Sequence, residues 1–122
     1  DRAKIAGGKV VIRRAGQELK FKTLDEQVRD IIPSDTVIFD TEQPLVLAGL
    51  MGGLDAGVTT DSTKLFIEVA NWEAPEVRKT SVRLGLRTDS SQRYEKTLDS
   101  NMCYRTLLRL VELINEHCPG AM

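Results

Sequence analysis

The sequence predicts an α+β fold, in which the first two-thirds of the chain form a mostly antiparallel sheet and helices in the last third pack against it. Short strand-like runs separated by Gly, Pro and Asp turns fill the N-terminal part, whereas helix start and stop signals begin at Pro75. A length of 122 residues suits a modest single core, so residues 1–122 are expected to form one domain.

Six short runs have the composition and alternation of strands. The first two alternate in character across Ala15-Gly16-Gln17, which predicts a hairpin between them. Turn signals such as Pro33-Ser34-Asp35 separate the later ones. The expected strands are residues 9–13, 18–23, 28–32, 37–40, 45–49 and 65–70.

Three helices are expected after residue 74. Pro75 suits the first helical position and Gly85 suits a left-handed stop. Asp89 with Gln92 three residues later predicts a capping box for a second helix that runs through Leu98. The third helix ends at Cys118-Pro119, and an apolar stripe predicts that one of its faces lies in the core. That stripe consists of Cys103, Leu107, Leu108, Leu110, Val111 and Ile114.

Charge and composition exclude several classes of protein. The net charge of −1 argues against a strongly basic nucleic-acid binder, and no apolar run is long enough to span a membrane. Cys103 and Cys118 share the third helix about 22 Å apart, so they do not bridge each other and are expected to be reduced thiols of a cytosolic protein. No cluster of cysteines or histidines suits a metal such as zinc.

Residues 74–96 carry a local excess of positive charge. Their basic side chains form either an RNA-binding face or a solvated helix face with ordinary ion pairs, and charge alone does not separate the two. The tRNA-binding candidates among them are Arg78, Lys79, Arg83, Arg87 and Arg93.

Glu68 is the residue whose position most needs an explanation. It shares the face of Phe66 and Ala70 within an apolar run, where a carboxylate is paired, lies at a sheet edge, or has a function. The glycine cluster at 49–57 lacks the lysine of a Walker loop, so it forms either tight turns or a close backbone approach to a ligand. Thr88 and Ser90 are either capping residues or ligands of a pocket.

Two long motifs carry a resemblance to a known family. PLVLAGLMGGLDAGVTTDSTKLFIEVANW, followed by RLGLRTDSSQRYEKTLD, resembles the central editing domain, of the tRNA-binding B3/B4 type, in the β chain of bacterial phenylalanyl-tRNA synthetase. The resemblance covers most of the chain and implies an α+β fold. It also implies that the chain is part of a longer protein, because the family's site includes a histidine in a segment just before the position matched by Asp1.

The resemblance implies a function and its partners. The family's domain hydrolyses tyrosine wrongly attached to the phenylalanine tRNA, and its β chain pairs with a catalytic α chain in a cytoplasmic heterotetramer. No cofactor is expected in this domain, since the ATP and magnesium of the parent synthetase bind elsewhere. No side chain is expected to act as a catalytic nucleophile, so a water or a tRNA hydroxyl is expected to attack the ester.

Five positions match pocket residues of the family. Glu68 matches the glutamate that receives the tyrosine hydroxyl, and Gly49 and Gly52 match glycines that line the amino-acid pocket. Thr88 matches a threonine of the pocket turn. Ser90 replaces the usual alanine at a position that sets the size of the pocket. Two other functions remain open: a non-catalytic tRNA-binding module that uses the arginines, and a structural module of the synthetase.

Overall fold

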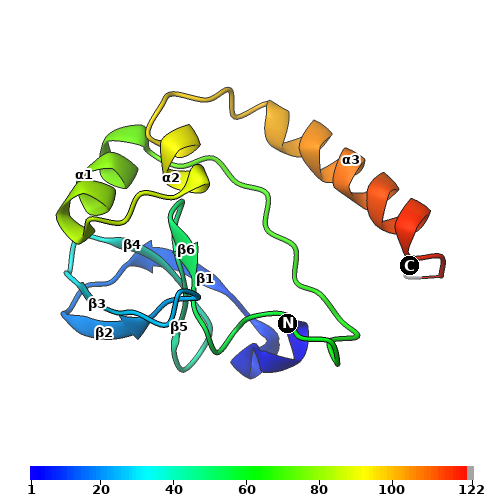
Figure 1. The fold of residues 1–122 in the computed structure, drawn as a ribbon, viewed down its shortest axis with the longest axis horizontal. Coiled ribbons are helices and arrows are strands. Elements are labelled where there is room, and N and C mark those ends of the chain that lie inside the picture. Colours follow the sequence, from blue (N-terminus) through cyan, green and yellow to red (C-terminus); the bar gives the residue numbers. More distant parts are fainter. Residues whose placement is uncertain (121–122) are drawn as a thin grey trace.

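The computed structural model describes residues 1–120 and confirms the α+β fold (Figure 1). Short 3-10 turns at Arg2–Lys4 and Ala6–Gly8 open the chain. The strands are β1 Val11–Arg14, β2 Leu19–Lys22, β3 Val28–Ile31, β4 Thr36–Phe39, β5 Pro44–Leu47 and β6 Met51–Gly52. The helices are α1 Ala74–Leu84, α2 Asp89–Tyr94 and α3 Met102–His117.

The strands of the described chain form two antiparallel sheets, a four-stranded sheet in the order β1-β4-β5-β6 and a β2-β3 pair. The predicted hairpin between residues 9–13 and 18–23 is therefore wrong, because β1 pairs with β4. The physical reason is the turn after β1. There the backbone N–H of Ala15 donates to the Asp35 carbonyl at 2.9 Å, and that of Gly16 donates to the Pro33 carbonyl at 3.0 Å. These bonds to a distant turn direct β2 toward β3 instead.

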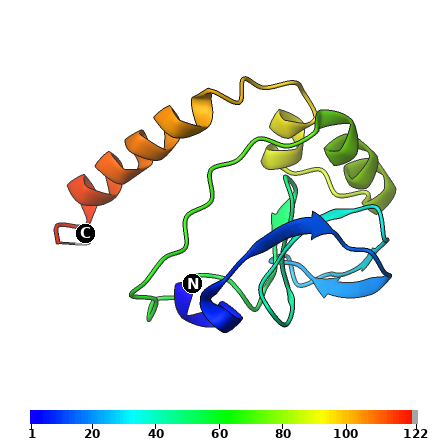
Figure 2. The same ribbon diagram turned by 180° about the vertical axis from the view of Figure 1, so that it is seen from behind.

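One apolar core joins both sheets to α1. Phe21 and Ile31 come from the small sheet, and Val37 and Leu47 come from the large sheet. Val77 closes the cluster from α1 and is 4% exposed, which places this helix against the strands (Figure 2). Burial of such side chains is the main favourable term in holding α1 in place.

The ends of α1 and α2 agree only partly with the sequence signals. Gly85 adopts φ +58° and ends α1, as predicted, and Pro75 lies in its first turn. The expected Asp89–Gln92 capping box is wrong, because the cap of α2 is Thr88. Its hydroxyl accepts from the Ser91 backbone N–H at 3.0 Å, and the Ser91 hydroxyl accepts from the Thr88 N–H at 2.9 Å. Asp89 is already inside the helix, where its side chain cannot cap.

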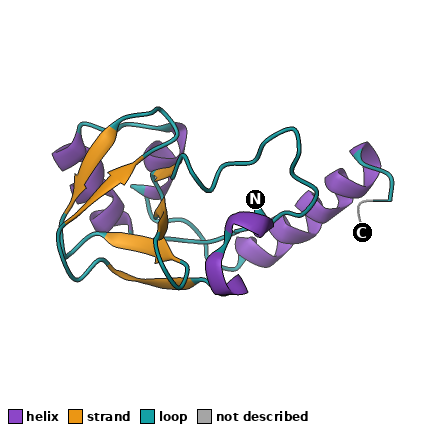
Figure 3. Cartoon of the chain, turned by 90° about the horizontal axis from the view of Figure 1, so that it is seen from below, coloured by secondary structure: helices purple, strands orange, loops and turns teal. Residues whose placement is uncertain are grey.

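Two C-terminal expectations are corrected. Residues 65–70 are extended but pair with no strand within residues 1–120, so the predicted sixth strand is absent from the described sheets. α3 has no buried residue and leads away from the sheets (Figures 1 and 3), so its apolar stripe is not core. Helical periodicity identifies an apolar face without identifying what covers it. In the described residues, no helix is long and apolar enough to cross a membrane.

Candidate functional site

A cavity of about 230 Å³ lies where the glycine loop (residues 49–57) meets α2 and the extended segment (residues 65–70). It brings together four of the five residues predicted for the site, although they come from different segments of the chain. The lining residues are Val46, Leu47, Gly49, Leu50, Met51, Gly52, Glu68, Trp72, Ser90 and Tyr94. Thr88 is the predicted residue that is not in the lining.

Glu68 presents a carboxylate without a protein partner to this cavity. The residue as a whole is exposed, yet partial burial of its carboxyl group raises the pKa above the usual value for glutamate. Within residues 1–120 no hydrogen bond or ion pair engages its side chain, and Arg87 binds Glu95 at 3.0 Å. The described residues therefore do not support the interpretation of Glu68 as a paired carboxylate. The carboxylate is free to accept a hydrogen bond from a ligand.

Gly49 and Gly52 line the cavity with backbone atoms, and a side chain at either position would also crowd neighbouring side chains. Gly49 adopts φ +70°, and a Cβ there would lie 2.9 Å from Val77 Cγ2 and 3.0 Å from Trp72 Cδ1. A Cβ at Gly52 would meet Leu24 Cδ1 at 3.2 Å. Gly49 thus lets the indole of Trp72 lie directly against the loop, and a side chain there would push on the wall of the cavity.

Thr88 does not line the cavity, but it holds the first turn of α2, which forms part of the cavity wall. Its hydroxyl donates to the Leu50 carbonyl at 2.9 Å while it caps α2. This pair of contacts fixes the start of α2 against the glycine loop. Ser90, two residues further on, is thereby held in the first turn of α2 at the cavity wall.

Two aromatic side chains of the site were missed by sequence reasoning. The Tyr94 hydroxyl donates to the Ala70 carbonyl at 3.2 Å, and burial, followed by the nearby Glu68 carboxylate, raises the pKa of its phenol. Its signal was the spacing from Ser90, since residues i and i+4 share one helix face. Trp72 follows the extended segment directly, and its buried Nε1 has no hydrogen-bond partner in the described chain.

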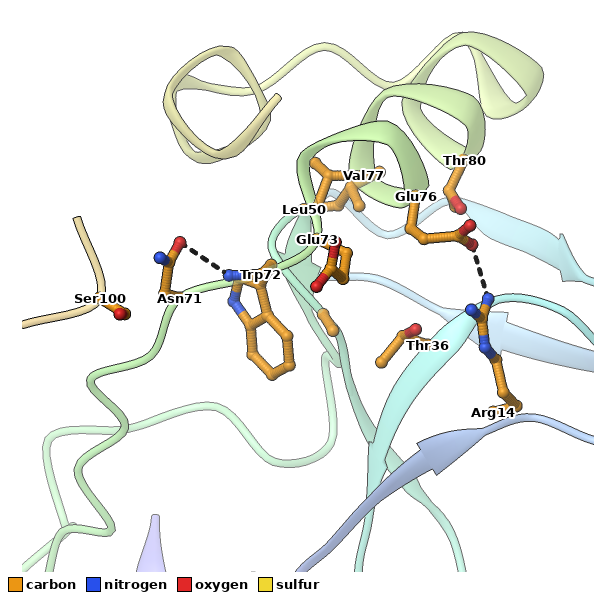
Figure 4. A pocket seen from close by; sticks show the side chains of 11 residues that line it. Arg14, Thr36, Leu50, Asn71, Trp72, Glu73, Glu76, Val77, Thr80 and Ser100 are labelled. Carbon is orange, nitrogen blue, oxygen red and sulfur yellow. Dashed lines mark hydrogen bonds and ion pairs between the residues drawn. The ribbon is translucent and has the colours of Figure 1, made fainter. Parts of the chain in front are cut away.

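A second cavity, of about 420 Å³, lies beside the start of α1 (Figure 4). Leu50 and Trp72 line both cavities. At the far side of the second cavity, Arg14 Nη1 and Glu76 Oε2 form an ion pair at 2.6 Å. The polar lining of this cavity comes from β1, β4, Asn71, Glu73, Glu76 and Thr80 of α1, and Ser100.

The five basic candidates for tRNA binding divide into two groups. Arg83 pairs with the buried carboxylate of Asp35, and Arg87 pairs with Glu95, so both have structural partners. Lys79 lies 3.6 Å from the Glu76 carboxylate at the surface of α1. Arg78 and Arg93 are exposed and make no ion pair within residues 1–120. These two are the basic side chains most available to a phosphate backbone.

Metal binding has no support in the described residues. Among residues 1–120, no group of three or more His, Cys, Asp or Glu side chains is arranged to hold a metal ion. The aromatic and carboxylate lining of the first cavity instead suits an organic ligand that carries an aromatic ring and a hydrogen-bond donor.

Comparison with known proteins places the chain in a family. The B3/4 domain family matches residues 1–119. The phenylalanine–tRNA ligase beta subunit of Geobacter metallireducens is 40% identical over 116 residues, which cover 95% of this chain and 14% of the relative. The beta subunit of Carboxydothermus hydrogenoformans is 38% identical over 122 residues, or 100% of this chain and 15% of the relative. The chain thus spans only a small part of these relatives, and it belongs to the B3/4 domain family.

Proposed function

We propose that this chain is the editing domain of a phenylalanine–tRNA ligase beta subunit, and that it hydrolyses tyrosine wrongly attached to the phenylalanine tRNA away from the aminoacylation site. The observation that carries the proposal is the partnerless Glu68 carboxylate in a cavity walled by Trp72 and Tyr94. The ring of an aromatic amino acid can pack on these two aromatic side chains, and a phenol hydroxyl can donate to the carboxylate.

Editing answers a physical limit on the first selection. A hydrophobic pocket built for phenylalanine rejects an analogue that merely adds a hydroxyl by only about a hundredfold. A second site that hydrogen-bonds the hydroxyl discriminates in the opposite direction, because phenylalanine would leave its polar group unpaired. Glu68 supplies such an acceptor.

The nucleophile in this proposal is a water molecule or a tRNA hydroxyl. No Cys, His or Lys side chain lines the cavity. The hydroxyl of Ser90 has no histidine or other base beside it in the lining, so nothing there activates it for attack. The domain's contribution is selection and orientation of the ester.

The same proposal includes the partners of the domain. The rest of the beta chain and a catalytic alpha chain would complete a cytoplasmic heterotetramer, and mischarged tRNA would be the substrate. ATP and magnesium would serve the aminoacylation site elsewhere in that assembly, with no cofactor in this domain.

The test is deacylation of Tyr-tRNA and Phe-tRNA by the intact beta chain with its alpha partner. We expect rapid release of tyrosine and slow release of phenylalanine. Salt-dependent tRNA binding without deacylation would favour a tRNA-binding module instead, for which exposed Arg78 and Arg93 are the supporting observation. An assembly that neither deacylates nor loses tRNA affinity when both arginines are replaced would favour a structural module.

A further inference from the structure

The extended segment that carries Glu68 has few attachments of its own. Within the described chain, residues 65–70 form no backbone–backbone hydrogen bond, and they run outside both sheets (Figure 1). The last such bond before them joins the Arg2 N–H to the Lys64 carbonyl at 2.9 Å. A segment with so few bonds can open locally at low cost in free energy. Something other than strand pairing must therefore fix the position of the Glu68 carboxylate.

Tyr94 joins this segment to α2. Its hydroxyl donates to the Ala70 carbonyl at 3.2 Å, and within residues 1–120 no other hydrogen bond connects residues 65–70 with α2. The ring of Tyr94 packs against the apolar core, so the hydroxyl is presented by an anchored side chain. Ala70 follows Glu68 by two residues, or about 7 Å of extended chain, and their side chains share one face.

The neighbouring attachment of the segment lies outside the cavity. The side-chain amide of Asn71 donates to the Leu98 carbonyl at 2.9 Å, and Leu98 follows α2 without lining the smaller cavity. Tyr94, in contrast, lines that cavity together with Glu68. The hydrogen bond from Tyr94 is thus the one that relates the Glu68 segment to the α2 wall of the site.

The chemistry of the phenol suits it to hold Glu68 without occupying it. A tyrosine hydroxyl has a single proton to donate, and the Ala70 carbonyl receives it. Burial and the nearby Glu68 carboxylate raise the pKa of Tyr94, so the hydroxyl stays protonated and remains a donor. Tyr94 therefore lies beside Glu68 and leaves its carboxylate open to a donor from a ligand.

We propose that Tyr94 is a positioning residue for the selection of tyrosine, whose hydroxyl, bound to the Ala70 carbonyl, holds Glu68 against the α2 wall of the smaller cavity. This inference rests on the proposed function. Without the hydroxyl, Glu68 keeps its charge and the cavity keeps its aromatic wall. The carboxylate is then distributed over more positions, so its bond to the phenol of the substrate is weaker.

The experiment removes one oxygen atom, with a matched control on α3. Tyr94→Phe and Tyr104→Phe are made in the intact beta chain with its alpha partner. Tyr104 is 69% exposed and makes no side-chain hydrogen bond within residues 1–120. Two quantities are measured: the ratio of Tyr-tRNA to Phe-tRNA deacylation, and the rate at which a glutamyl endopeptidase cuts after Glu68, followed by mass spectrometry. Cleavage reports how often this segment opens.

We expect Tyr94→Phe to lower the deacylation ratio and to speed cleavage after Glu68, each by roughly two- to tenfold, which corresponds to the loss of one neutral hydrogen bond. Tyr104→Phe should change neither quantity. Tyr94→Phe is also made in the Glu68→Ala background, where it should leave the deacylation ratio unchanged, because a residue that acts through Glu68 has no effect once Glu68 is gone.

Two results in a protein that edits would overturn the inference. One is an unchanged deacylation ratio in Tyr94→Phe, even if its Tm falls. The other is an equal loss of the ratio in the Glu68→Ala background, since Tyr94 would then act on the substrate itself. If no protein releases tyrosine, the proposed function fails, and faster cleavage in Tyr94→Phe would still support the hold on Glu68. Equal cleavage of all the proteins would refute that hold in either case.

Discussion

Replacing Glu68 by alanine removes the one partnerless carboxylate of the smaller cavity while leaving its aromatic walls in place. A hydrogen bond from the phenol of tyrosine to a charged acceptor contributes about 1.5–3 kcal/mol, which corresponds to roughly ten- to a hundredfold in selectivity. We expect Glu68→Ala to lose that factor in the ratio of Tyr-tRNA to Phe-tRNA deacylation. Glu68→Gln keeps a neutral acceptor, so its ratio of Tyr-tRNA to Phe-tRNA deacylation should fall between that of the unmodified protein and that of Glu68→Ala.

The thermal stability of variants at Glu68 is the second measurement. The direction of its change with pH follows from the raised pKa of Glu68. Partial burial raises the pKa of Glu68, so the folded state retains this proton to higher pH than the unfolded state does. The protonated carboxyl group of Glu68 contributes stability to the folded state, and this contribution is lost as the pH rises through the pKa of Glu68 in the folded state. Because the residue is exposed and screened by solvent, the effect should stay below about 1 kcal/mol.

Thermal unfolding of Glu68→Gln should therefore show an equal or slightly higher Tm than the unmodified protein at pH 7, and no difference below about pH 4. Glu18→Gln serves as the matched control, because Glu18 is exposed and makes no ion pair within residues 1–120. A variant at Glu68 that lowers Tm at pH 7 while keeping its preference for Tyr-tRNA would refute the recognition role.

Three further changes address the cavity and its supports. Ser90→Trp should block Tyr-tRNA hydrolysis with little change in Tm, because Ser90 is exposed at the cavity wall. Gly49→Ala should lower the free energy of unfolding in urea by more than the roughly 1–2 kcal/mol of left-handed strain, because its Cβ would also press on Trp72. Arg83→Ala should cost about 1–3 kcal/mol in the same assay, since it removes a partner of buried Asp35.

Each of these changes has a control elsewhere in the two helices. Gln92→Trp introduces the same side chain on α2 outside the cavity and should leave hydrolysis intact. Equal activity of both tryptophan variants would place Ser90 outside the pocket. Gly85→Ala meets the same backbone strain with no atom within 4 Å of its Cβ, so equal costs at Gly49 and Gly85 would contradict the packing argument. Lys79→Ala removes a surface charge of α1 and should leave stability nearly unchanged.

Local chemistry in the sequence was sufficient for the order and type of most elements. The left-handed stop at Gly85 and the helix start marked by Pro75 in the first turn of α1 depend on groups within a few residues, so both can be predicted without the fold. The same holds for strands such as β3 and β4, which alternation and turn residues bounded to within a residue or two.

Long-range pairing decided the rest. The partner of β1 depends on backbone bonds between the turn at Gly16 and the turn at Pro33, which no local pattern encodes. The stripe on α3 indicated an apolar face, but its position away from the core follows from the path of the chain.

The candidate site shows the same division. Glu68 stood out in the sequence because a carboxylate within an apolar run needs a reason, and the family motif supplied Gly49 and Ser90. Only the tertiary structure shows that Glu68 and these residues line one cavity, and that Tyr94 forms part of its wall. The same holds for the second cavity, lined by Glu73. Residue type limits which chemistry a side chain can perform, whereas a cavity exists only where folding brings distant segments together.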